Sequence, residues 1–158
     1  NAIRDTLSAI DPTRAETFTK NAAAYSQQLS QLDADYRAGL TRCDNRVVVT
    51  PHAAFTYLAN EYQFDVIPIT GLSPEEEPSA GRLSAIAELA KEKNIKYIYF
   101  ETLVSPKLAQ TIADEIGAQT LVLNPIEGLT NEDIAAGKNY LSIMRENLTN
   151  LKTGMLCQ

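Results

Sequence analysis

From Arg46 onward the chain alternates short apolar runs with amphipathic segments, and this alternation constrains the fold more than any other feature. The apolar runs lack polar alternation, so we expect strands that are buried on both faces. Strands joined by helical crossovers form a parallel sheet with helices on each side. The sequence therefore predicts an α/β fold with a four-stranded, mostly parallel sheet flanked by helices. The predicted strands are Val47–Thr50, Val66–Ile69, Tyr97–Phe100 and Thr120–Leu123; the predicted helices are Ala53–Tyr62, Ser79–Lys93, Pro106–Ile116 and a last helix from about Asn131.

The amino-terminal part of the chain is predicted to be a long helical arm. Apolar residues at its start fall on one face of a helix that stops at Asp11-Pro12, where the aspartate can cap and the proline can open the next helix. A second apolar stripe then recurs at three- and four-residue steps from Phe18 and ends near Gly39 to Cys43. With 158 residues, of which 44% are hydrophobic, we expect one well-buried core plus this arm.

Charge and composition indicate which kinds of molecule the chain can bind. The formal net charge is -6, and the fourteen Lys and Arg residues are scattered, which argues against a nucleic-acid-binding surface and favours cations. No run approaches the roughly 20 apolar residues of a membrane-spanning helix, and the first residues lack a signal-peptide pattern. We therefore expect a soluble chain. Because it begins inside a helical pattern, we also expect it to be a piece of a longer protein.

His52, the only histidine, follows the first predicted strand. Ligands of parallel α/β proteins bind at the carboxyl ends of strands, and imidazole is a common metal ligand, although a lone histidine can also cap a helix or pack against aromatic rings. Glu127 follows the last strand and can either bring a carboxylate into the same crevice or serve as a loop acid near the final helix. For Glu101, after the third strand, we expect a hydrogen bond to a neighbouring loop. The acidic trio Glu75 to Glu77 is expected to be solvated, with one member capping the helix that begins at Pro78-Ser79.

Catalytic motifs give little support for an enzyme. The sequence contains no G-x-S-x-G, no G-x-x-x-x-G-K-[ST], no G-x-G-x-x-G and no H-E-x-x-H. A small α/β enzyme that uses His52 with Glu101 or Glu127 as an acid-base pair is the alternative from this class. We predict that the chain is not an enzyme.

The two cysteines are informative about compartment. Cys43 precedes the first strand, and the last helix runs back toward that edge of the sheet and carries Cys157 with it. The topology can therefore bring the two thiols together, either as a disulfide formed in an oxidising compartment or as two unpaired buried thiols. A metal site built from them is not expected, because they lie at the opposite edge from His52.

Several short segments, taken in order, resemble the metal-binding substrate proteins of ABC importers, the family that captures zinc or manganese outside the cytoplasmic membrane. The resemblance covers nearly the whole chain and rests on the order and spacing of its landmarks. These are Ile10-Asp11-Pro12, Asn21 to Tyr25, Leu32 to Arg37, Thr50 to Leu58, Gly71 to Glu75, Glu77-Pro78-Ser79, Asn124 to Leu129 and Ala136 to Tyr140.

The resemblance implies an architecture and a site. Such proteins have two α/β lobes joined by a rigid helix, with the metal held by two ligands from each lobe. Residues 1–42 then correspond to the end of the linking helix and the helix after it, and residues 43–158 to the carboxyl-terminal metal-binding lobe. His52 corresponds to the third metal ligand and Glu127 to the fourth. The two histidines of the other lobe would precede Asn1.

The resemblance also implies a metal, a partner and a location. Manganese-selective relatives are similar in having a carboxylate at the third position, whereas His52 makes the site nitrogen-rich, which suits Zn²⁺; Mn²⁺ is the alternative. The expected function is that of an extracytoplasmic zinc-binding component, present as a fragment without its amino-terminal lobe, which docks on a membrane permease. The location is the periplasm or, through a lipid anchor outside this chain, the outer face of the cytoplasmic membrane. We expect a monomer that binds no nucleic acid. An adhesin is a third possible function.

Overall fold

The computed structural model describes residues 1–73 and 75–158. The chain divides into two compact units, Asn1–Asp35 and Tyr36–Gln158, and each is described by itself. The predicted division into residues 1–42 and 43–158 stays a prediction.

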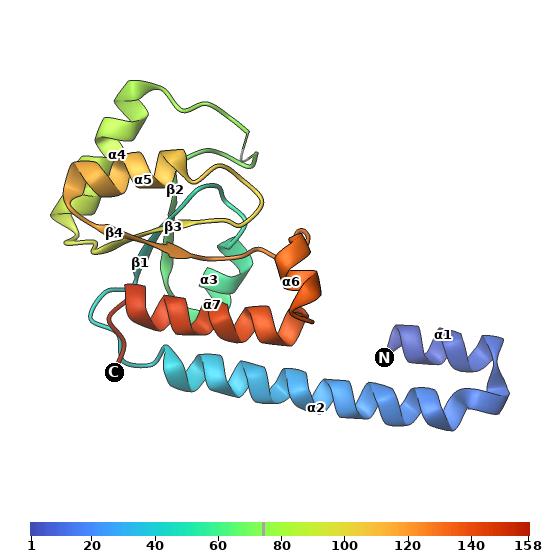
Figure 1. The fold of residues 1–158 in the computed structure, drawn as a ribbon. Coiled ribbons are helices and arrows are strands. Elements are labelled where there is room, and N and C mark those ends of the chain that lie inside the picture. The colour runs from blue at the N-terminus through green and yellow to red at the C-terminus, as the bar shows by residue number, and fades with distance from the viewer. Residues whose placement is uncertain (74) are drawn as a thin grey trace. The chain divides into compact units, whose positions relative to one another are not determined.

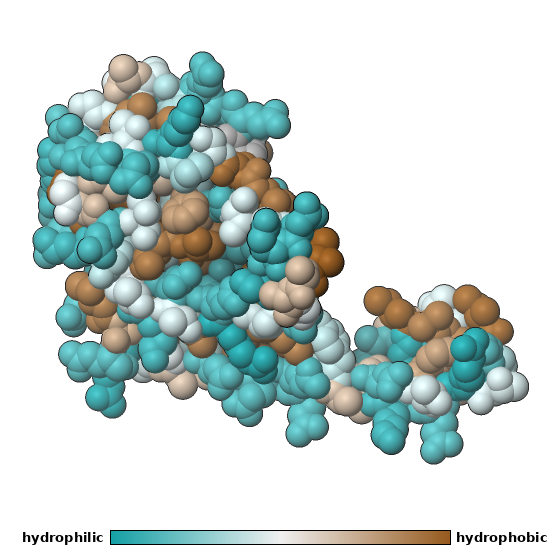
Figure 2. All heavy atoms as spheres, viewed as in Figure 1, coloured by the Kyte–Doolittle hydropathy of each residue, from teal (hydrophilic) through white to brown (hydrophobic). Residues whose placement is uncertain are grey.

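The first unit is helical, as its apolar periodicity predicts. Helix α1 (Ala2–Ile10) is followed by a short 3₁₀ turn, η1 (Pro12–Arg14), and by α2 (Ala15–Gly39), which continues into the second unit. Asp11 lies at the end of α1, and its carboxylate accepts hydrogen bonds from the side chains of Thr13 and Arg14, which lower the pKa of Asp11. Figure 2 shows hydrophobic side chains on the surface of α1. Ile3 and Ile10 of this helix are strongly exposed.

The second unit contains a sheet of four short strands, which are parallel in every pairing observed among the described residues. They are β1 (Val47–Thr50), β2 (Asp65–Pro68), β3 (Tyr97–Phe100) and β4 (Gln119–Val122). Their spatial order is β2-β1-β3-β4. The chain thus moves outward from β1 to β2, returns to β3 on the other side of β1, and continues to β4. The predicted α/β fold and parallel sheet are confirmed.

Helices cover both faces of this sheet (Figure 1). Helices α4 (Ala80–Glu92) and α5 (Lys107–Ile116) pack on one face, whereas α3 (Thr56–Tyr62) and α7 (Tyr140–Gly154) lie on the other. Right-handed crossovers account for the positions of α3, α4 and α5, because the direction of travel across the sheet reverses after β2 and places α4 and α5 on the face opposite α3. Helix α7 follows the last strand and is not part of a crossover. The resulting layers bury the two central strands, β1 and β3, from both sides, whereas the edge strands β2 and β4 are only partly buried.

The hydrophobic core beneath α4 and α5 is built from small and branched side chains. Val49 and Ile98 from the two central strands are fully buried there. They pack in one cluster with Ile86, Ala90 and other residues of the covering helices. On the opposite face, buried Tyr99 donates a hydrogen bond from its hydroxyl group to the Asn150 carbonyl of α7, at 3.1 Å. The central strands β1 and β3 are therefore fixed from both sides.

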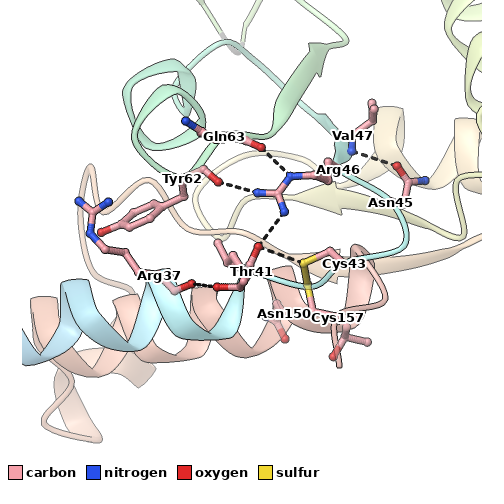
Figure 3. Close-up of a disulfide and its surroundings, with 12 residues drawn as sticks. Arg37, Thr41, Cys43, Asn45, Arg46, Val47, Tyr62, Gln63, Asn150 and Cys157 are labelled. Atoms are coloured by element: carbon pink, nitrogen blue, oxygen red, sulfur yellow. Dashed lines mark hydrogen bonds between the residues drawn. A yellow bond between two sulfur atoms is a disulfide. The ribbon is translucent and has the colours of Figure 1, made fainter.

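A disulfide links Cys43, just before β1, to Cys157, just after α7 (Figure 3). The two cysteines face each other in an isolated antiparallel bridge with a Cα–Cα distance of 3.8 Å. The nearby Arg46 guanidinium donates to three backbone carbonyls, those of Leu40, Tyr62 and Gln63, at 2.7 to 2.8 Å. Of the two states that the sequence left open for the thiols, the structure shows the bridged one.

Two helix predictions need correction. The predicted final helix is two helices, α6 (Asn131–Ala135) and α7, because Gly137 adopts a left-handed conformation (φ 67°) and Asn139 caps α7 anew. The helix predicted from Ala53 begins at Thr56. The backbone between β1 and α3 instead forms turns. Among the described residues, no helix has the length and apolar character needed to cross a membrane.

Candidate metal-binding site

The loop after β1 carries His52 to the point where the sheet changes direction. Strands β1 and β3 are neighbours, but their crossovers lead to opposite sides, and such a switch point is where parallel α/β proteins bind ligands. Two contacts fix the loop: the Thr50 hydroxyl donates to the His52 carbonyl at 2.9 Å, and the Ala53 N–H donates to the Gly71 carbonyl at 3.0 Å. The backbone around His52 is therefore held by its own turn and by the loop after β2.

Glu101, directly after β3, meets His52 across this switch point. Its Oε1 lies 2.7 Å from His52 Nδ1, and both residues are 3% exposed. Burial raises the pKa of the Glu101 carboxyl because desolvation disfavours the charged form, while the charge and hydrogen bond of His52 act in the opposite direction. The predicted hydrogen bond of Glu101 to a neighbouring loop is present, and its partner is the one histidine.

The loop that carries Glu127 is clamped by α7. The Asn147 side chain accepts a hydrogen bond from the Asn124 N–H at 2.9 Å and donates one to the Asn124 carbonyl at 2.8 Å. The Asn124 side chain in turn accepts from the Ile126 N–H at 2.7 Å. Ile126 has a φ of 63°, a strained value for a β-branched residue, so the loop is held in a shape that the chain would not adopt freely.

These elements bring the two predicted ligands together. His52 Nε2 lies 3.5 Å from Glu127 Oε1. The His52 side chain is 4% exposed and that of Glu127 is 56% exposed, so the pair has one buried and one open side. Among residues 1–73 and 75–158, no group of three or more His, Cys, Asp or Glu side chains could hold a metal ion by itself. The imidazole thus has a carboxylate near each nitrogen, Glu127 near Nε2 and Glu101 near Nδ1.

The acidic trio does not join this pair. Glu75 to Glu77 are exposed, and the Glu76 carboxylate accepts a hydrogen bond from the Gly71 N–H at 2.8 Å. The expectation that one of the three caps α4 is wrong, because Ser79 is the cap and its hydroxyl accepts from the Arg82 N–H at 3.2 Å. The shorter serine side chain directly precedes the helix and reaches its first turn more easily.

Asn147 is the residue that sequence reasoning missed. It lies on the same buried stripe of α7 as Ile143 and Leu151, one helical turn from each. A polar side chain within an apolar stripe is a signal for a buried hydrogen bond. That signal predicts a polar anchor but does not identify the loop that it holds.

Comparisons with known proteins identify the family of the chain. The model of the family described as "Zinc-uptake complex component A periplasmic" matches residues 1–154. "Zinc-binding lipoprotein AdcA" of Streptococcus pneumoniae is 51% identical over 150 residues, which are 95% of this chain and 30% of that protein. "High-affinity zinc uptake system protein ZnuA" of Bacillus subtilis is 45% identical over 146 residues, which are 92% of this chain and 46% of that protein. The chain thus spans less than half the length of either relative.

Solved structures show the same similarity. The Zn(II)-bound ZnuA-like domain of Streptococcus pneumoniae AdcA superimposes with a TM-score of 0.82 at 50% identity, over 97% of this chain and 57% of that one. The laminin-binding protein Lmb of Streptococcus agalactiae, titled a bifunctional protein with adhesin and metal-transporting activity, gives a TM-score of 0.86 at 35% identity, over 97% and 58% of the two chains. The α/β fold, the switch-point pair and the family match lead to one conclusion: the chain belongs to the family of periplasmic zinc-uptake complex component A proteins.

Proposed function

We propose that this chain contributes two ligands, His52 Nε2 and the Glu127 carboxylate, to a zinc site whose role is to capture the ion for import. The distance between the two atoms supports the proposal most strongly. A tetrahedral zinc with bonds of about 2.0 to 2.1 Å to nitrogen and about 2.0 to 2.2 Å to oxygen separates the two ligand atoms by roughly 3.3 to 3.5 Å. The observed separation of 3.5 Å matches this value without any rearrangement.

The ligand count supports a site that is completed from outside these residues. Zinc in proteins takes four ligands, or three with an open position. The described part of this chain offers two at the switch point. The remaining ligands are proposed to come from a facing lobe, as in the two-lobed proteins that the sequence resembles.

Zinc is favoured over manganese by the donor set. A neutral imidazole binds zinc well, whereas manganese prefers oxygen ligands and stands lower in the Irving-Williams order. The relatives described as zinc-binding and zinc-uptake proteins agree with this choice. The loaded protein is proposed to act outside the cytoplasmic membrane, to deliver zinc to an ABC permease, to work as a monomer, and to perform no catalysis.

Zinc titration calorimetry on this chain tests the ligand assignment. We expect His52→Ala and Glu127→Ala each to weaken zinc binding strongly, and Mn²⁺ to bind more weakly than Zn²⁺ to the unmodified chain. Glu115→Ala is the matched control, because Glu115 is an exposed acid at the end of α5, at the amino edge of the sheet, and should bind no zinc. Unchanged zinc binding in His52→Ala would refute the assignment.

A further inference from the structure

We propose that Glu101 is a positioning residue, which accepts a hydrogen bond from His52 Nδ1–H and thereby leaves the lone pair of Nε2 free for zinc. The inference rests on the proposed function for its consequence, but the hydrogen-bonded state itself can be measured without metal. Its basis is a buried pair, Glu101 Oε1 and His52 Nδ1, 2.7 Å apart.

A neutral histidine carries its single ring proton on one of two nitrogens, and only the other nitrogen can bind a metal. Both nitrogens of His52 have a carboxylate nearby: Glu101 at 2.7 Å from Nδ1 and Glu127 at 3.5 Å from Nε2. The two acids therefore compete for the same proton. If Glu127 won, Nε2 would be protonated and could not act as a zinc ligand.

The environments of the two carboxylates favour Glu101 as the acceptor. Its contact is within normal hydrogen-bond length, and it is 3% exposed, so water does not weaken the interaction. The Glu127 contact is at the outer limit of a hydrogen bond, and its side chain is 56% exposed, so water can satisfy its oxygens instead. The proton is therefore placed on Nδ1.

Glu101 also fixes the direction in which the ring faces. It follows the last residue of β3, a strand that lies beside β1 in the sheet, so the acceptor is mounted on rigid backbone. An imidazole held at Nδ1 by such an acceptor cannot rotate Nε2 away from Glu127 without breaking a buried hydrogen bond. Partners of this kind orient metal-binding histidines and raise their basicity, and their loss typically costs about 10- to 100-fold in metal affinity.

Nitrogen NMR of the metal-free chain tests the proposal directly. Because His52 is the only histidine, ¹⁵N-histidine labelling gives one pair of ring signals. At a pH where the signals show a neutral ring, we expect the Nδ1–H tautomer in the unmodified chain. Glu101→Leu should shift the population to Nε2–H. Glu101→Gln should retain the Nδ1–H tautomer, because its amide oxygen can still accept the hydrogen bond. This variant shows whether a hydrogen-bond acceptor at position 101 is enough to set the tautomer. Glu127→Gln is the matched control and should leave the tautomer unchanged.

Zinc affinity gives the second readout. Glu101→Leu should lose about 10- to 100-fold in affinity, and Glu101→Gln should lose less. If a neutral Glu101 instead donated its proton to Nδ1, the unmodified chain would show the Nε2–H tautomer. That result would overturn the proposal. So would an Nδ1–H tautomer that persists in Glu101→Leu. If the tautomers behave as expected but zinc does not bind at His52, the proposed function fails and the positioning by Glu101 stands. If Glu101→Leu does not fold, the unmodified chain and Glu101→Gln still decide the tautomer.

Discussion

The disulfide between Cys43 and Cys157 should contribute a large share of the folding stability of the chain. It closes a loop with a sequence separation of 114 residues, and it joins the segment before β1 to the end of α7. In the chain-entropy model, a loop of that length restricts the unfolded state by about 5 kcal/mol. Natural domains have unfolding free energies of about 5 to 15 kcal/mol, so losing the bond should remove a substantial part of the total.

The perturbation is the double replacement Cys43→Ala with Cys157→Ala, and the assay is urea unfolding followed by far-ultraviolet circular dichroism. With a urea dependence of about 2 kcal/mol per molar, a loss of about 5 kcal/mol lowers the unfolding midpoint by roughly 2.5 M. The unmodified chain in the presence of a reducing agent is the matched control, because it keeps both side chains and lacks only the bond. The two samples should unfold at similar midpoints.

The reasoning is refuted if oxidised and reduced chains unfold within about 1 kcal/mol of each other, because loop closure would then not govern the stability of the unfolded state. A change confined to the double variant would instead point to lost packing of the cysteine side chains. The Arg46 guanidinium and its carbonyl partners lie near the bond (Figure 3).

Three further perturbations test the packing around the sheet and the site. Gly154→Ala would place a Cβ 2.0 Å from the Tyr99 hydroxyl and should cost about 1 to 3 kcal/mol in urea unfolding, whereas Gly81→Ala, whose nearest neighbour is 4.0 Å away, should be neutral or stabilising. Asn147→Ala removes both bonds to the buried Asn124 backbone and should cost about 2 kcal/mol or more; equal unfolding midpoints would contradict the clamp. Hydrogen bonds from Lys138, which has the larger effect, and from Thr130 lower the pKa of Asp133 in the folded state. Asp133 therefore stabilises the fold at pH values above its pKa in the unfolded chain, and this contribution is lost as the pH falls through its lower pKa in the folded chain. In Asp133→Asn, the free energy of unfolding should fall less steeply as the pH is lowered through this range.

Much of the fold could be predicted because the two central strands, β1 and β3, are largely buried and read as apolar runs. The run from Val47 to Val49 is apolar, Thr50 extends it, and Pro51 ends it; the observed β1 has the predicted bounds, Val47–Thr50. The final helix was harder to predict from the sequence, because apolar residues recur on both sides of the break at Gly137. Only the left-handed backbone of that glycine and the new cap at Asn139 separate α6 from α7.

The candidate site was predictable in part. His52 and Glu127 each follow a strand, and the rule that parallel strands end at one edge places both on the same side of the sheet. Their separation, and the contact of His52 with Glu101, depend on which strands are neighbours. The order β2-β1-β3-β4 is set by packing across the whole core. No local pattern near His52 specifies that β3 lies beside β1.

The central claim is that His52 Nε2 and Glu127 bind the same zinc ion, and a zinc titration of the ¹⁵N-histidine-labelled chain tests it most directly. The single histidine makes the assignment of the ring signals unambiguous. As zinc is added, the Nε2 signal should move strongly while Nδ1 keeps its proton, and Glu127→Ala should require much more zinc for the same change. Ring signals that do not respond to zinc, or that respond equally in Glu127→Ala, would contradict the account.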